Sequence, residues 1–223
     1  MFAGHFAPVT VLQRFYPNVS PYVFTLGVGA LDVIFGILTY LGIEGFSPNP
    51  QAGPMGVDIH CNYSHSLLGS IILSFIYGIA TAGRSSAIIP GFLASFSHFI
   101  GDMLVHNQDL VLDPFSNIMI GGTNMWGNFP TFAFYFEMAF CLVCATQSHK
   151  DSHTLLANGL ILFLHFSGRS GTSELLQKVF RLPEALQQKY TAVIITSSFI
   201  VPGLILGYIL NRKKSLIESS KRK

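Results

Sequence analysis

A histidine and an aspartate stand four residues apart in an apolar run, at His98 and Asp102, and a second histidine follows at His106. Residues four apart in a helix lie on one face, so the three side chains would form a single polar stripe. An ionisable side chain at the centre of a bilayer costs about 2.5–3.5 kcal/mol on insertion scales and usually faces a partner or a cavity. The stripe therefore predicts a functional site, and His-x-x-x-Asp is one way for a helix to present two metal ligands.

The remaining polar residues of this kind gather in the first half of the chain, at His5, Asp32, His60, His65 and Asp109. Imidazole and carboxylate together suit zinc, manganese or iron better than magnesium or calcium. A site with three protein ligands leaves a position for water, whose pKa zinc lowers to about 7. A single histidine in an apolar run more often bonds to a neighbouring polar group, so the prediction depends on the whole set.

The composition is that of a membrane protein. Only 11% of the residues are charged and 50% are hydrophobic, whereas an ordinary soluble domain has roughly 25% charged residues. The net charge of +2, with its basic excess at the C-terminus, offers no basic face for nucleic acid. We therefore expect an integral membrane protein that crosses a lipid bilayer several times.

The predicted fold class is all-α, a polytopic helical transmembrane bundle with five to six spanning segments, preceded by an N-terminal amphipathic segment at Met1–Tyr16. A span needs about 20 apolar residues. The candidates are Pro21–Ile43, His65–Gly83, Ala87–His106, Trp126–Thr146, His153–Ser167 and Thr191–Leu210, the last interrupted by Pro202. The fifth candidate is short and would leave five spans if it were re-entrant.

The connections predict how the polar residues meet. Glu44–Ser64 and Asn107–Met125 are loops by composition, and only Arg84–Ser86 separates the second and third candidate spans. So short a turn predicts an antiparallel hairpin, which brings His65 toward the stripe of His98. The two loops contain no lysine or arginine, so the positive-inside rule places them away from the cytoplasm.

Several motifs occur in a characteristic order: Ala3-Gly4-His5-Phe6, Leu31-Asp32, Tyr63-Ser64-His65-Ser66-Leu67-Leu68, Ser97-His98-x-x-x-Asp102 and His106-x-x-Asp109. In this order they resemble the YdjM-like family of membrane-bound metal-dependent hydrolases, over roughly residues 1–146. The resemblance implies a metal site formed by His5, Asp32, His65, His98 and Asp102, with His106 and Asp109 close by. It divides the chain into a hydrolase-like membrane domain, 1–148, and C-terminal membrane segments with a basic tail, 149–223.

The function predicted from the sequence is hydrolysis by metal-activated water at a membrane. The metal ligands are His5, Asp32, His65, His98 and Asp102; the metal is zinc, with manganese or iron as alternatives. His106 or Asp109 acts as general base or orienting residue, and the substrate is a lipid or another phosphoester.

Two other functions remain open. A proton- or ion-coupled transporter would use Asp32, His98 and Asp102 as a relay. A non-catalytic scaffold would use the polar residues only to join helices, although such hydrogen bonds contribute only about 0.6 kcal/mol each on average in membranes.

Overall fold

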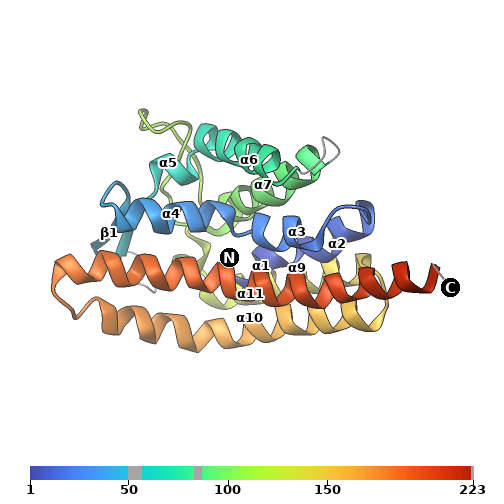
Figure 1. Cartoon of the computed structure of the whole chain (residues 1–223). Coiled ribbons are helices and arrows are strands. Elements are labelled where there is room, and N and C mark those ends of the chain that lie inside the picture. The colour runs from blue at the N-terminus through green and yellow to red at the C-terminus, as the bar shows by residue number, and fades with distance from the viewer. Residues whose placement is uncertain (50–56, 83–86, 222–223) are drawn as a thin grey trace.

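A computed structural model describes residues 1–49, 57–82 and 87–221 of the chain (Figure 1). It is mostly helical, as predicted. The helices are α1 (Ala3–Phe6), α2 (Pro8–Phe15), α3 (Pro21–Gly27), α4 (Ala30–Tyr40), α5 (Asn62–His65), α6 (Leu67–Thr81), α7 (Ile88–Val105), α8 (Met125–Asn128), α9 (Pro130–Gln147), α10 (Ser152–Val179) and α11 (Glu184–Lys221).

Two small antiparallel hairpins interrupt the helical fold, in the stretches predicted to be loops. Strand β1 (Gly45–Pro48) pairs with β2 (Val57–His60), and β3 (Leu110–Val111) pairs with β4 (Met119–Gly121). The first hairpin ends directly before α5, and the second follows α7. Both hairpins therefore order the chain next to helices that carry candidate site residues.

Fewer helices could cross a membrane than the five to six predicted. Within the described residues, α7 and the Leu186–Arg212 part of α11 are long and apolar enough, and α3 with α4 would make a third span, bent by 49°. Helix α6 has 15 residues, or about 22 Å at 1.5 Å per residue, which is short of the roughly 30 Å hydrocarbon core. Helix α9 carries Glu137 within its apolar run and polar residues at both ends, which lowers its mean hydropathy.

The C-terminal segments differ from the prediction in their continuity. The apolar stretch 153–167 and much of the charged stretch after it form one helix, α10, of 28 residues. No proline interrupts the sequence between Ser152 and Pro183, so nothing breaks the backbone hydrogen bonds there. Helix α11 continues through Pro202, as apolar helices in membranes can when neighbouring groups satisfy the freed carbonyl. Helices α10 and α11 lie side by side along one edge of the molecule (Figure 1).

The N-terminal segment does not lie on the surface as a single amphipathic helix. It forms α1 and α2, and α1 packs against α7, α9 and α10 near the middle of the molecule (Figure 1). The side chains of Ala3 and Phe6 are fully buried. The prediction fits only α2, which buries Val9 and exposes Arg14. This placement carries His5 into the interior.

Helices α6 and α7 pack closely, as the hairpin prediction requires, and Ser74 Oγ donates a hydrogen bond to Ser95 Oγ at 2.9 Å between them. The predicted turn, 84–86, lies outside the described residues. The other side of α6 exposes Ile72, Phe75, Ile76 and Ile79 by about half of their surface. An unbroken apolar face of this kind is typical of contact with lipid.

We predict that Ile76→Cys is shielded by lipid. In membrane fragments open on both sides, a charged maleimide should label Ile76→Cys much more slowly than Phe115→Cys, because Phe115 is 87% exposed on a connecting segment. The three native cysteines are buried and set the background. Detergent extraction serves as a control for chemical reactivity, and equal labelling rates in the membrane would contradict lipid contact by α6.

Candidate metal centre

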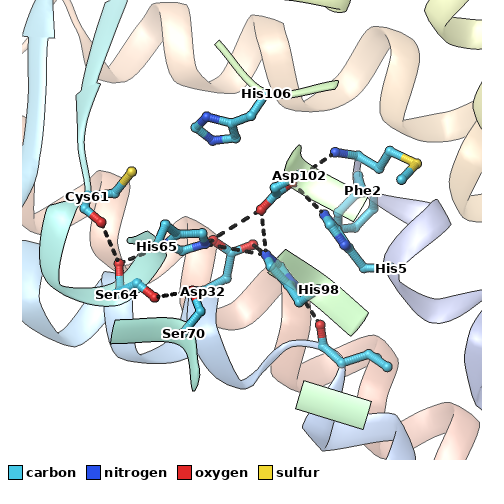
Figure 2. A network of polar contacts seen from close by, with 12 residues as sticks. Phe2, His5, Asp32, Cys61, Ser64, His65, Ser70, His98, Asp102 and His106 are labelled. Carbon is cyan, nitrogen blue, oxygen red and sulfur yellow. Dashed lines mark hydrogen bonds and ion pairs between the residues drawn. The ribbon is translucent and has the colours of Figure 1, made fainter. Parts of the chain in front are cut away.

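Five side chains that the sequence singles out as ligands meet in the interior. His5 comes from α1, Asp32 from α4, His65 from α5, and His98 and Asp102 from α7 (Figure 2). Their ligand atoms form two overlapping groups that could hold a metal ion: His5, His98 and Asp102, and Asp32, His65 and His98. His60, in β2, bonds to Ser47 Oγ at 2.7 Å and lies outside both groups.

The orientation of His98 is fixed by the backbone of another helix. Its Nδ1 lies 2.7 Å from the carbonyl oxygen of Val28. A carbonyl only accepts hydrogen bonds, so Nδ1 must carry the proton. In the neutral ring Nε2 is then an unprotonated acceptor, and it faces Asp102 Oδ2 at 3.0 Å and Asp32 Oδ2 at 3.3 Å.

The ring of His65 is held in a similar way. Its Nδ1 lies 2.7 Å from Ser64 Oγ, and the same hydroxyl lies 3.5 Å from the carbonyl oxygen of Cys61. When the hydroxyl donates to that carbonyl, its oxygen accepts the Nδ1–H of His65. The Nε2 atom of His65 then presents a lone pair to the cluster, 3.4 Å from Nε2 of His98.

Two imidazole nitrogens and two carboxylates therefore converge with their acceptors facing one another. His65 Nε2 lies 3.5 Å from Asp32 Oδ1 and 3.7 Å from Asp102 Oδ2. Four acceptors at such distances repel one another unless a proton or a cation lies between them. Asp102 is buried, and the side chain of Asp32 is only 18% exposed, so little water reaches the cluster to screen this repulsion.

The donor set fits a small divalent metal. Zinc binds imidazole nitrogen and carboxylate oxygen at about 2.0–2.2 Å in tetrahedral sites, which places neighbouring ligand atoms roughly 3.4 Å apart. The separations between His65, His98, Asp32 and Asp102 lie between 3.0 and 3.7 Å. The backbone carbonyl and the hydroxyl on the far nitrogens are the usual partners that orient metal-binding histidines.

His5 completes the cluster from the side. Its ring stacks on that of His98 with centroids 3.7 Å apart, and its Nε2 lies 3.1 Å from Asp102 Oδ1. Burial lowers the pKa of His5 to about 3, so the ring is neutral at physiological pH. Gly101 makes the approach possible, because a Cβ there would lie 3.2 Å from the His5 ring. Since His98 has only one free nitrogen, His5 either joins the same ion or orients Asp102.

His106 and Asp109 form a separate pair beside the cluster. His106 Nδ1 lies 2.6 Å from Asp109 Oδ1, and the His106 ring is roughly parallel to that of His65 with centroids 6.2 Å apart. Burial disfavours the charged ring, but the carboxylate outweighs it, so the pKa of His106 lies above its ordinary value. Figure 2 shows His106 apart from the dashed network that joins the five other side chains.

Local sequence explains how these residues are held. Glu44 Oε1 accepts the N–H groups of Tyr63 at 2.7 Å and Ser64 at 2.9 Å, at the start of α5. Burial raises the pKa of Glu44, although these N–H groups act in the opposite direction. Ser66 then caps α6 by accepting the N–H of Gly69. The short helix that presents His65 is thus fixed at both ends by side chains.

Glu137 is a residue whose role the sequence did not indicate. Its Oε1 accepts the backbone N–H of Phe2 at 3.0 Å and of Gly4 at 2.6 Å, and its Oε2 lies 3.8 Å from His165 Nδ1. A carboxylate within an apolar helix was the available signal, but its partners are backbone groups more than 130 positions away. Glu137 fixes the first turn of α1 and thereby the position of His5.

Comparison of the chain with protein-family models, with curated proteins and with solved structures finds no match. The resemblance to the YdjM-like family and the individual ligand roles therefore remain predictions. The geometry alone establishes that a buried cluster of histidine and aspartate side chains could hold a metal ion.

Replacing Glu137 should destabilise the protein chiefly through α1. In Glu137→Leu two N–H groups lose their acceptor, and each buried unsatisfied group costs about 1–3 kcal/mol. Glu137→Gln keeps a carbonyl oxygen that can accept both. We expect a much lower thermal midpoint in detergent for the leucine variant than for the glutamine variant. Equal midpoints would show that Glu137 does not anchor α1.

Proposed function

We propose that this protein is a membrane-associated, metal-dependent hydrolase. The observation that carries the proposal is the convergence of two Nε2 lone pairs, from His65 and His98, with the carboxylates of Asp32 and Asp102. A divalent metal held there would act as a Lewis acid and lower the pKa of water to about 7. Zinc fits best, and manganese and iron fit the same ligand types.

The pair of His106 and Asp109 would move the proton. With its Nδ1–H bonded to Asp109 Oδ1, His106 keeps Nε2 free to accept a proton from water and to return it to a leaving group. The carboxylate stabilises the positive ring that forms, which is the same effect that raises the pKa of His106. His106 thus acts as general base, and Asp109 holds its ring in the required tautomer.

The substrate class follows from where the cluster lies. His98 and Asp102 belong to α7, one of the helices apolar enough to cross a membrane, and the exposed apolar face of α6 packs beside it. A lipid or a lipid-linked phosphoester could reach such a site from the bilayer without leaving it. We therefore propose a lipid phosphoester as substrate.

Transport is the alternative that a specific observation favours. The α3–α4 segment is a candidate span with a 49° bend next to Asp32, and broken helices with carboxylates at mid-depth are common in transporters. A transporter would carry protons or ions through Asp32, His98 and Asp102, and its flux would persist after strong chelation.

Metal analysis tests the proposal first. Protein purified in detergent should contain about one equivalent of zinc, manganese or iron by mass spectrometry. His98→Ala and Asp102→Ala should lose the metal, because each removes a ligand whose partners remain buried. His153→Ala, a histidine outside the cluster, serves as the matched control and should keep it. Folded protein that neither carries nor takes up metal would overturn the proposal and favour transport.

A second variant separates proton transfer from metal binding. Asp109→Asn should retain the metal and lower the rate of hydrolysis of phospholipid vesicles by about 10²–10⁴-fold, the usual contribution of a positioned acid or base. The pH at which activity rises should also shift downward, since the raised pKa of His106 depends on this carboxylate. Full activity in Asp109→Asn would exclude His106 and Asp109 from the reaction.

A further inference from the structure

A pocket of about 310 Å³ lies between β2 and the segment that follows α7. Small-molecule sites usually occupy roughly 300–1,000 Å³. Apart from Ile59, its lining is polar, and the polar residues are Asp58, His60, Asn107, Gln108, Asp109 and Asn124. A pocket of this size with so polar a wall suits a hydrophilic ligand rather than an acyl chain.

The charges of the wall restrict the ligand further. None of the described residues that line the pocket is a lysine or arginine, whereas two, Asp58 and Asp109, are aspartates. The wall would therefore repel a phosphate or a carboxylate. Side-chain amides of Asn107 and Gln108 add both donors and acceptors. Hydroxyl groups, which also donate and accept, match this mixture better than an ammonium group, which only donates.

One acceptor in the wall has no partner. Asp109 Oδ2 is shielded from solvent and makes no hydrogen bond among the described residues, while Oδ1 of the same carboxylate bonds to His106. A ligand hydroxyl donating to Oδ2 would satisfy it. The same side chain thus joins the pocket to the proton-transferring pair beside the metal cluster.

We propose that this pocket binds the hydroxyl-rich headgroup of the substrate. This proposal rests on the proposed function, since it assigns the polar end of the lipid to the pocket and the scissile ester to the neighbouring cluster. Asp58 and Gln108 hold hydroxyls at the rim, and Asp109 senses the headgroup at the inner end. The favoured substrates carry a polyol such as inositol or glycerol, rather than an amine.

The single tryptophan of the chain, Trp126 in α8, lies two residues from Asn124 and reports on this pocket. The full-length protein in detergent is titrated with myo-inositol, and binding is followed by Trp126 fluorescence and by saturation-transfer NMR of the inositol signals. We expect saturable binding of inositol and none of ethanolamine. Phosphatidylinositol in phosphatidylcholine vesicles, with phosphatidylserine as the control of equal charge, distinguishes a lipid headgroup from a free polyol.

Variants assign the binding to the pocket. Asp58→Ala and Gln108→Ala should each weaken inositol binding about tenfold, as expected for one lost hydrogen-bonding group. Gln147→Ala, at an exposed end of α9, should change nothing. Absence of inositol binding by both methods, equal binding of ethanolamine, or unchanged affinity in Asp58→Ala and Gln108→Ala would overturn the proposal.

The same titration in His98→Ala separates the two proposals. Pocket residues are not among the metal-binding groups, so inositol should still bind when the metal is lost. Inositol binding by a protein that takes up no metal would overturn the hydrolase and leave the pocket. A metal-loaded protein that hydrolyses lipid without preference for a polyol headgroup would overturn the pocket alone.

Discussion

The hydrogen bond from His98 Nδ1 to the Val28 carbonyl determines the arrangement of the other ligands. Val28 lies at the break between α3 and α4, where carbonyls lack a partner within the helix. The break frees this acceptor and also places Asp32 in the first turn of α4, where the helix dipole favours a carboxylate. One interruption of an apolar segment thus fixes the tautomer of the central histidine and supplies the carboxylate that faces it.

The part of the site that follows from local spacing could be predicted from the sequence. His98 and Asp102 share a helix face because they are four residues apart, and the short connection between α6 and α7 brought His65 to them. Asp32 was conspicuous as a carboxylate in an apolar run. Spacing could not place His5, since a short N-terminal helix can lie on the surface or inside the bundle. Its proximity to Asp102 was expected only from the family resemblance.

The parts that the sequence did not predict depend on contacts between distant segments. Glu137 bonds to backbone groups, which leave no trace in residue type, so its role in holding α1 had no signature beyond its position. The hairpin of β1 and β2 replaced an expected loop because its prolines and glycines lie largely between the strands. The excess of predicted spans arose because apolar runs such as α6 have the composition of a transmembrane helix but not its length.

The contact between Glu137 and the amides of Phe2 and Gly4 has a consequence for biosynthesis. The two partners are separated by 135 and 133 positions, so α1 cannot take its final place until α9 has been made. During synthesis, the carboxylate of Asp102 therefore enters the membrane before His5 can reach it. A chain stopped before α9 would carry an incompletely surrounded acidic residue among apolar helices, which is the kind of defect that cellular quality control recognises.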